Sequence, residues 1–173
     1  MMEKYDIVVI GGGPSGVSLS KLLGNKFKMA VIRPENYSMI YCALPYAIEG
    51  LIENEKTFKS DSLVTDAGAK LIHDKVIKVN IGDKSLDLEK GSSIAYDKLI
   101  IATGTVPFIP PIPGHNLNGV TGFKTEDDLL WMENKIKDIN DAVVVGAGAI
   151  GVELAQALAF KGINVHLVDV ADS

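Results

Sequence analysis

Residues 5–16 read YDIVVIGGGPSG, in which a short apolar run meets three consecutive glycines and then a segment that can open a helix. Gly11, Gly13 and Gly16 satisfy the spacing G-x-G-x-x-G. In a strand–turn–helix that holds a dinucleotide, the first glycine permits the tight turn and the second lets the backbone approach the pyrophosphate. The third lets the helix pack close to the strand, and the free N–H groups of the helix face the phosphates. The stretch predicts a Rossmann-like unit that binds a dinucleotide.

A second copy of the pattern strengthens this interpretation, since a single glycine-rich turn is common. Residues 141–153, DAVVVGAGAIGVE, repeat the layout with Gly146, Gly148 and Gly151 after an apolar run. The strand that follows ends in Asp169, 23 residues after Gly146. A carboxylate there favours a free ribose 2′-hydroxyl and repels a 2′-phosphate. We therefore expect two nucleotides, the second of them NAD(H) rather than NADP(H).

Composition excludes several classes of protein. The chain has 173 residues, of which 47% are hydrophobic, and its net charge of −5 comes from scattered charges of both signs, so no nucleic-acid or membrane surface is expected. No apolar run approaches the roughly 18 residues of a membrane span, and no signal peptide is expected before the first strand. One cysteine excludes an internal disulfide and fits a reducing compartment, so the expected location is cytoplasmic. The three histidines have no carboxylate or thiol at ligand spacing, so no metal site is expected.

Further elements are expected along the chain. A helix over residues 17–23 and a strand over 29–32 complete the first βαβ unit. Alternating apolar residues over 71–88 predict a small antiparallel hairpin or meander, and 99–102 predict a buried strand. Several polar residues before the meander are expected as solvated surface. These residues are Lys56, Thr57, Lys59, Ser60 and Asp61.

Four prolines follow within residues 107–113 and predict an extended connector. Thr125 and the acidic residues after it predict a capped helix start. The expected domains are therefore 1–113, a connector and helix over 114–140, and an incomplete second unit over 141–173.

The end of the second strand carries an unusual residue. An acidic side chain there usually accepts hydrogen bonds from the adenosine ribose. Here the position is Arg33, 22 residues after Gly11, with Glu35 two residues further on. Either Glu35 reaches the ribose after the Pro34 bend, or Arg33 stacks on adenine or meets a phosphate, or neither touches the nucleotide.

The only cysteine, Cys42, lies in SMIYCALPYAIEG over residues 38–50. A lone cysteine is most often a buried small hydrophobe. Cys42 nevertheless follows a turn-prone stretch, and Pro45 fits the first turn of a helix, where N–H groups stabilise a thiolate. No second thiol is present for a dithiol pair, so a redox role would rest on Cys42 alone.

Four stretches together resemble a known family. They are VVIGGGPSG at 8–16, CALPY at 42–46, YDKLIIATGTVP at 96–107 and VVVGAGAIGVELA at 143–155. The chain resembles the N-terminal part of the pyridine nucleotide–disulfide oxidoreductase superfamily, and most nearly its single-cysteine branch of coenzyme A-disulfide reductases and NADH oxidases. The resemblance implies an α/β fold: a Rossmann-like FAD-binding βαβ unit with a small antiparallel β-meander, then the beginning of a second Rossmann-like unit for NAD.

The same resemblance implies roles for particular residues. Cys42 would be the redox thiol at the flavin, and Val76 would meet the adenine through its backbone. The FAD pyrophosphate and the closing loop would involve Gly11, Gly13, Pro14, Ser15, Gly16, Ala102, Thr103 and Gly104. The NAD(H) half would involve Gly146, Gly148, Ile150, Gly151, Glu153 and Asp169, although Glu153 also has a plain interpretation as a helix residue at the sheet edge.

The implied reaction is hydride transfer from NADH to flavin and then reduction of oxidised Cys42. A small-molecule disulfide, a polysulfide and oxygen all remain open as acceptors, and a homodimer is expected. Family members continue well beyond Ser173 with a Gly-Asp element at the flavin, which Gly82-Asp83 in the expected hairpin does not replace. We therefore expect the isolated chain to be poorly active. The alternatives are a non-catalytic nucleotide-binding module and a dehydrogenase without flavin.

Overall fold

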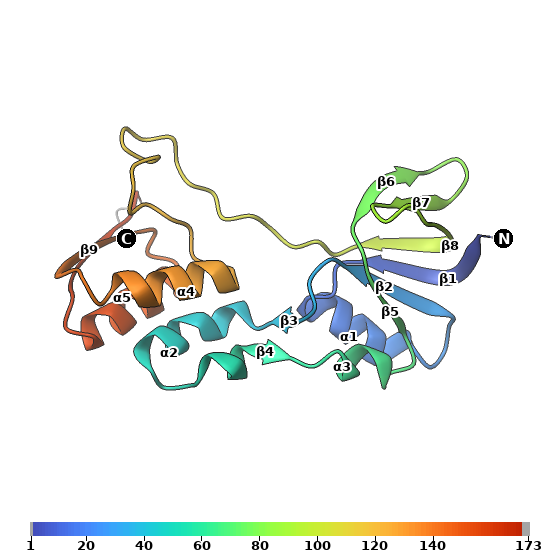
Figure 1. Ribbon diagram of the computed structural model, residues 1–173, viewed down its shortest axis with the longest axis horizontal. Coiled ribbons are helices and arrows are strands. Elements are labelled where there is room, and N and C mark those ends of the chain that lie inside the picture. Colours follow the sequence, from blue (N-terminus) through green and yellow to red (C-terminus); the bar gives the residue numbers. More distant parts are fainter. Residues whose placement is uncertain (1, 171–173) are drawn as a thin grey trace. The chain divides into compact units, whose positions relative to one another are not determined.

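A computed structural model describes residues 2–170 of the chain (Figure 1). The chain divides into two compact units, Met1–Ile40 with Phe58–Thr105, and Tyr41–Thr57 with Val106–Ser173. Each unit combines helices with parallel strands, so the α/β class predicted from the sequence is confirmed. The domain boundaries expected near residues 113 and 140 stay predictions, and residues 171–173 of the third expected segment lie outside the described residues.

The first unit is built on a six-stranded sheet with the order β5-β2-β1-β8-β7-β6. Its strands are β1 (Glu3–Ile10), β2 (Met29–Arg33), β5 (Lys70–His73), β6 (Val76–Asn80), β7 (Ser85–Leu88) and β8 (Ser93–Ile101). The unit also contains the helices α1 (Pro14–Leu23) and α3 (Ser62–Thr65), and the short antiparallel pair β3 (Ser38–Met39) and β4 (Phe58–Lys59). Figure 1 shows α1 and α3 lying together beside the parallel strands.

The parallel part of the sheet has β1 at its centre. β1 pairs in parallel with β2 on one side and β8 on the other, and β2 pairs in parallel with β5. The meander expected over residues 71–88 is confirmed for β6 and β7, which pair antiparallel with each other. β7 also pairs antiparallel with β8. The predicted start of the meander is wrong, because β5 joins the parallel sheet next to β2. Alternation alone does not distinguish a half-buried parallel edge strand from a hairpin strand.

Two apolar clusters cover the opposite faces of this sheet. One gathers Val9 and Val31 with Val17 of α1 and Val64 of α3. The other gathers Val8 and Ile32 with apolar residues of the meander strands. β2 is buried along its whole length, as expected for a parallel strand covered on both faces. The strand expected over 99–102 is present as the last part of the longer β8, which ends at Ile101. It is not buried as expected, since Ile101 is 67% exposed.

One ion-pair group ties the first strand to the edge strand. The carboxylate of Glu3 lies 2.9 Å from Lys70 Nζ and 3.4 Å from Lys28 Nζ. The Lys70 ammonium is the main cause that lowers the pKa of Glu3 to about 2. A carboxyl whose pKa is lowered on folding adds stability above its ordinary pKa, and this stability is lost as the pH falls through the folded-state pKa.

We therefore expect Glu3→Gln to lower the thermal midpoint slightly at pH 7, since the pair is exposed and screened by solvent. The difference from the unsubstituted protein should shrink as the pH falls from about 4.5 toward 2. Thermal melts across this range measure it. Glu89→Gln is the matched control, because Glu89 lies 4.0 Å from Lys75 in an exposed pair. A difference that stays constant with pH would contradict the assignment.

The second unit contains one parallel strand pair and several helices. Its elements are η1 (Tyr41–Ala43), α2 (Leu44–Glu49), η2 (Asn54–Thr57), α4 (Glu126–Lys135), β9 (Asp141–Val145), α5 (Ala149–Phe160) and β10 (Asn164–Val168). The expected cap of α4 is confirmed: the Asp128 N–H donates to Thr125 Oγ1 at 3.1 Å, and the Thr125 N–H donates to the Asp128 carboxylate at 2.8 Å. β9 and β10 pair in parallel, and α5 connects them as the crossover of a βαβ unit.

Two polar residues differ from their expected solvated positions. Thr57 is fully buried and donates its hydroxyl to the Asn54 carbonyl oxygen at 2.6 Å. Asp61 is only partly exposed, because it pairs with a buried arginine. Across residues 2–170, no helix is both long and apolar enough to span a membrane.

Candidate functional site

The first glycine turn has the geometry that its sequence predicts. Gly11 has φ +114°, a left-handed conformation that favours glycine, and its N–H donates to the Ile32 carbonyl oxygen at 2.8 Å. A Cβ on Gly16 would collide with the Gly11 carbonyl oxygen, so α1 packs against the turn only because residue 16 has no side chain. A Cβ on Gly13 would meet nothing within 4 Å. The open space at Gly13, where α1 begins, fits a pyrophosphate held by backbone N–H groups.

The second turn repeats this geometry. Gly146 has φ +108°, and its N–H donates to the Val168 carbonyl oxygen at 2.8 Å. A Cβ on Gly151 would collide with the Gly146 carbonyl oxygen, whereas Gly148 opens onto free space. Asp169, directly after β10, accepts a hydrogen bond from the Ala147 N–H within the turn. The carboxylate predicted to face a ribose therefore does lie at the glycine turn.

Arg33 ends β2 but does not extend into solvent. Its side chain is 2% exposed and ion-pairs with Asp61. Its Nη1 donates to the Gly12 carbonyl oxygen at 3.2 Å, and its Nε donates to the Glu35 carbonyl oxygen at 3.0 Å. A Cβ on Gly12 would collide with the Arg33 side chain, so the middle glycine of the three makes room for this arginine.

His73, the last residue of β5, joins the same group. Its Nδ1 lies 3.0 Å from the Glu35 carbonyl oxygen, and its Nε2 lies 2.9 Å from Oδ2 of Asp61. Only the backbone carbonyl of Glu35 takes part in these contacts, and Glu35 is an exposed residue. We name Arg33, Asp61 and His73 the Arg–Asp–His cluster. No local sequence pattern points to Asp61 and His73, because Asp61 is far from Arg33 in the chain and pairs with it only after folding.

The remaining residues expected at the first site occupy its surroundings. Pro14 and Ser15 are exposed at the start of α1, and the Ala102 N–H donates to the Ile10 carbonyl oxygen at 2.8 Å next to the turn. Thr103 and Gly104 follow as exposed residues, and Val76 opens β6 with its side chain against the sheet core. Their roles toward a cofactor stay predictions.

Cys42 is an exposed free thiol within η1, directly before α2. The expected helix is present, with Pro45 in its first turn. One turn further on, the Tyr46 hydroxyl donates to Glu153 Oε1 at 3.1 Å. Glu153 lies on α5, the helix that begins at the second glycine turn, and Ile150 is exposed in its first turn. Within the second unit, the cysteine-bearing segment is thus joined to the helix of the second turn.

The Glu153 carboxylate raises the pKa of Tyr46 above its ordinary value of 10.0. The main cause is the hydrogen bond that the carboxylate accepts from the Tyr46 hydroxyl, and the second is the negative charge of Glu153. Glu153→Gln removes the charge, so we expect the ionisation of one tyrosine to move to lower pH. Titration of tyrosinate absorbance near 295 nm measures this shift. Glu133→Gln is the control, because Glu133 accepts from Asn54 Nδ2 at 2.9 Å instead. An unchanged titration in Glu153→Gln would contradict the hydrogen bond.

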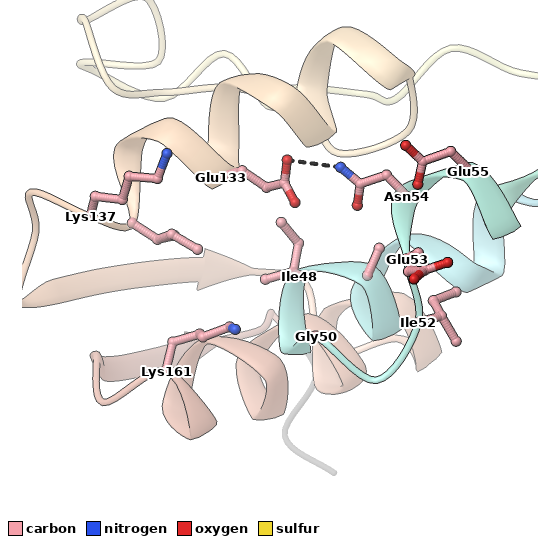
Figure 2. Close-up of a pocket in the computed structure, with 11 residues that line it drawn as sticks. Ile48, Gly50, Ile52, Glu53, Asn54, Glu55, Glu133, Lys137 and Lys161 are labelled. Atoms are coloured by element: carbon pink, nitrogen blue, oxygen red, sulfur yellow. Dashed lines mark hydrogen bonds between the residues drawn. The ribbon is translucent and has the colours of Figure 1, made fainter.

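A cavity of about 680 Å³ lies elsewhere in the second unit. Figure 2 shows Glu133 of α4 and Lys137, shortly after this helix, on one side, Asn54 and Glu55 on another, and Lys161 directly after α5. None of the residues expected to bind a cofactor lines this cavity. Its mixed charges identify no particular ligand.

Comparison with known proteins agrees with these features. The sequence pattern of a family described as pyridine nucleotide-disulphide oxidoreductase matches residues 5–173. An NADH oxidase of Enterococcus faecalis is 32% identical over 96% of this chain and 40% of its own length. An NAD(P)H coenzyme A polysulfide/persulfide reductase of Pyrococcus horikoshii is 30% identical over 95% of this chain and 39% of its own length.

Among solved structures, reduced CoADR-RHD from Bacillus anthracis superimposes with a TM-score of 0.84 at 28% identity, covering 99% of this chain and 33% of that one. A NAD-dependent persulfide reductase of A. fulgidus gives a TM-score of 0.82 at 28% identity, over 96% of this chain and 34% of that one. These matches confirm the expected family and its oxidoreductase class. The chain spans about 40% of the length of the curated relatives named above.

Proposed function

Since this chain belongs to the pyridine nucleotide-disulphide oxidoreductase family, we propose that it forms the nucleotide-binding part of an NADH-dependent flavoprotein that reduces a substrate through Cys42. FAD and a pyridine nucleotide are the cofactors that membership implies. The first glycine turn would hold FAD and the second would hold NADH. Asp169 supports NADH over NADPH, because a carboxylate bonded to the second turn repels a 2′-phosphate.

The observation that carries this proposal is the repetition of one turn geometry, once in each unit. In both turns the first glycine is left-handed, the third has no room for a side chain, and the second faces free space. Backbone N–H groups at the start of α1 and of α5 can therefore approach a pyrophosphate without a side chain in the way. Two such turns suit a protein that holds two dinucleotides.

Cys42 is proposed as the residue that contacts the substrate. Its thiolate would attack a small-molecule disulfide, forming a mixed disulfide on Cys42 and releasing one thiolate. Bound FAD supplies the two-electron chemistry that links NADH to this thiol. When the mixed disulfide receives two electrons, it releases the second thiolate and restores Cys42. A polysulfide would react in the same way, and with oxygen or peroxide the oxidised form would be a sulfenic acid.

The relatives support this range of acceptors, since their names include an NADH oxidase and a coenzyme A polysulfide/persulfide reductase. The exposure of Cys42 supports a thiol that small substrates can reach. We also propose a cytoplasmic location, because a free thiol is typical of a reducing compartment. A homodimer is proposed from the resemblance to the family alone.

The test is the visible absorption spectrum of the purified protein before any cofactor is added. We expect flavin bands that persist through gel filtration and bleach when NADH is added without oxygen. A colourless protein that binds NADH but cannot be reconstituted with FAD would favour the alternative, a nucleotide-binding module without catalysis. Bleaching by NADPH as fast as by NADH would contradict the role of Asp169.

A further inference from the structure

The end of β2 lacks the acidic side chain that a dinucleotide-binding unit normally places beside the adenosine ribose. Arg33 occupies this position, and its guanidinium is turned inward to the Gly12 and Glu35 carbonyl oxygens. A ribose hydroxyl at this place can donate a hydrogen bond, and a guanidinium cannot accept it, because a guanidinium only donates. An acceptor for that hydrogen bond has to come from another group.

Asp61 supplies a carboxylate at this place from a different part of the chain. It stands directly before α3, and its two oxygens bond separately, Oδ1 to Arg33 and Oδ2 to His73. Arg33 ends β2 and His73 ends β5, so the carboxylate lies at the carboxyl ends of two neighbouring parallel strands. In doubly wound sheets, ligands bind outside this edge.

The Arg–Asp–His cluster also touches the glycine turn directly. Arg33 Nη1 lies 3.2 Å from the Gly12 carbonyl oxygen, between the first and second glycines of the pattern. The same guanidinium therefore holds both the turn and the Asp61 carboxylate. This shared contact sets the carboxylate beside the turn before any ligand arrives, so little ordering of the side chain remains to be done on binding.

Asp61 keeps acceptor capacity after these contacts. A carboxylate has about four lone-pair sites, and hydrogen bonds to Arg33 and His73 use two of them. Its side chain is 35% exposed, whereas that of Arg33 is 2% exposed. The arginine is thus the buried anchor, and the carboxylate is the part of the pair that a ligand can reach.

We propose that Asp61, held by Arg33 and His73, is the acceptor for the adenosine ribose hydroxyls of the dinucleotide at the first glycine turn. This inference rests on the proposed binding of FAD there. Asp61 takes the place of the acidic residue missing from the end of β2, and Arg33 is a positioning residue for it. The rival acceptor is Glu35, whose carboxylate is exposed nearby.

The test combines protein variants with an altered ligand. Flavin-stripped protein is titrated with FAD, and with an FAD analogue whose adenosine ribose lacks both the 2′- and 3′-hydroxyls, while flavin fluorescence is followed. We expect the unsubstituted protein to bind the dideoxy analogue about 10- to 100-fold more weakly, the effect of losing hydrogen bonds to a charged acceptor. In Asp61→Asn, FAD binding should weaken by a similar factor, and removal of the hydroxyls should add little.

Two single variants serve as controls. Asp66→Asn removes an equal charge just after α3, outside the cluster, and should leave the penalty for the dideoxy analogue unchanged. Glu35→Gln tests the rival acceptor. The inference is overturned if the penalty persists in Asp61→Asn, if it disappears in Glu35→Gln instead, or if the unsubstituted protein shows no penalty.

Asp61→Asn leaves a buried arginine without a counter-charge, so its thermal midpoint must be checked. If this variant does not fold, the double variant Arg33→Met with Asp61→Asn removes both charges and avoids the unpaired cation. The same comparison of the two ligands then decides the inference. Failure of the proposed function is seen separately, because the unsubstituted protein would then bind neither FAD nor its analogue.

Discussion

Gly16→Ala should abolish FAD binding and lower the thermal midpoint of the protein by several degrees. The new Cβ would lie on top of the Gly11 carbonyl oxygen, which is backbone and part of the turn itself. Alanine in a helix gains up to about 1 kcal/mol over glycine. Overpacking typically costs about 1–3 kcal/mol, and more where the neighbour is backbone that cannot rotate away. The steric cost of the new Cβ therefore exceeds the gain in helix propensity. Flavin absorbance after gel filtration and a thermal melt measure the two effects.

Two other glycines make matched controls for this substitution. Gly82→Ala places its Cβ in open space in the β6–β7 turn and should change neither property. Gly13→Ala also meets no protein atom within 4 Å, so the fold should persist while FAD affinity falls, because the methyl group enters the space proposed for the pyrophosphate. Gly16→Ala protein that keeps both its flavin and its thermal midpoint would show that the turn can relax. The close packing would then not be a requirement of the site.

Cys42→Ser should reduce disulfide or polysulfide turnover by about three orders of magnitude or more, as expected when a covalent nucleophile is lost. A hydroxyl has nearly the shape of a thiol but is a far weaker nucleophile at neutral pH. The exchange leaves the backbone of the first glycine turn unaltered, so we expect flavin to stay bound there. NADH-dependent release of thiol from a small disulfide, followed with a thiol reagent, measures the loss.

A control variant shows whether this loss is specific to the thiol. Tyr41→Phe, directly beside Cys42, removes only a hydroxyl and should keep most of the turnover. If Cys42→Ser retains flavin and bleaching by NADH but reduces no disulfide, the thiol carries the final step. If Cys42→Ser kept both disulfide reduction and oxygen consumption undiminished, the proposed role of the thiol would be refuted. Loss of oxygen consumption with retained disulfide reduction would refute the disulfide as the substrate of Cys42 and favour oxygen instead.

Much of the fold follows from local chemistry that the sequence shows directly. The two glycine patterns predict strand–turn–helix units because Gly11 and Gly146 must adopt left-handed backbone, which other residues rarely do. Thr125 predicts the start of α4 because a hydroxyl at that position satisfies a free N–H group. Such signals act within a few residues, so no knowledge of the folded chain is needed to interpret them.

Other features depend on contacts between distant residues. The strand Lys70–His73 resembles the start of a hairpin in sequence, but it pairs in parallel with β2. Pairing partners depend on the whole sheet, and a short alternating run fits either arrangement. The same limit hid the Tyr46–Glu153 hydrogen bond, whose partners are 107 residues apart in the chain.

The two glycine turns, the family and the single cysteine can all be read from the sequence, because each depends on residue type at short spacing. The surroundings of the end of β2 beside the first turn depend on contacts that form only on folding. There Gly12 makes room for Arg33, and Arg33 bonds to Asp61, which the sequence alone places on the solvated surface. A buried guanidinium requires a counter-charge, and the chain supplies it from 28 residues away, so folding rather than local sequence positions that carboxylate.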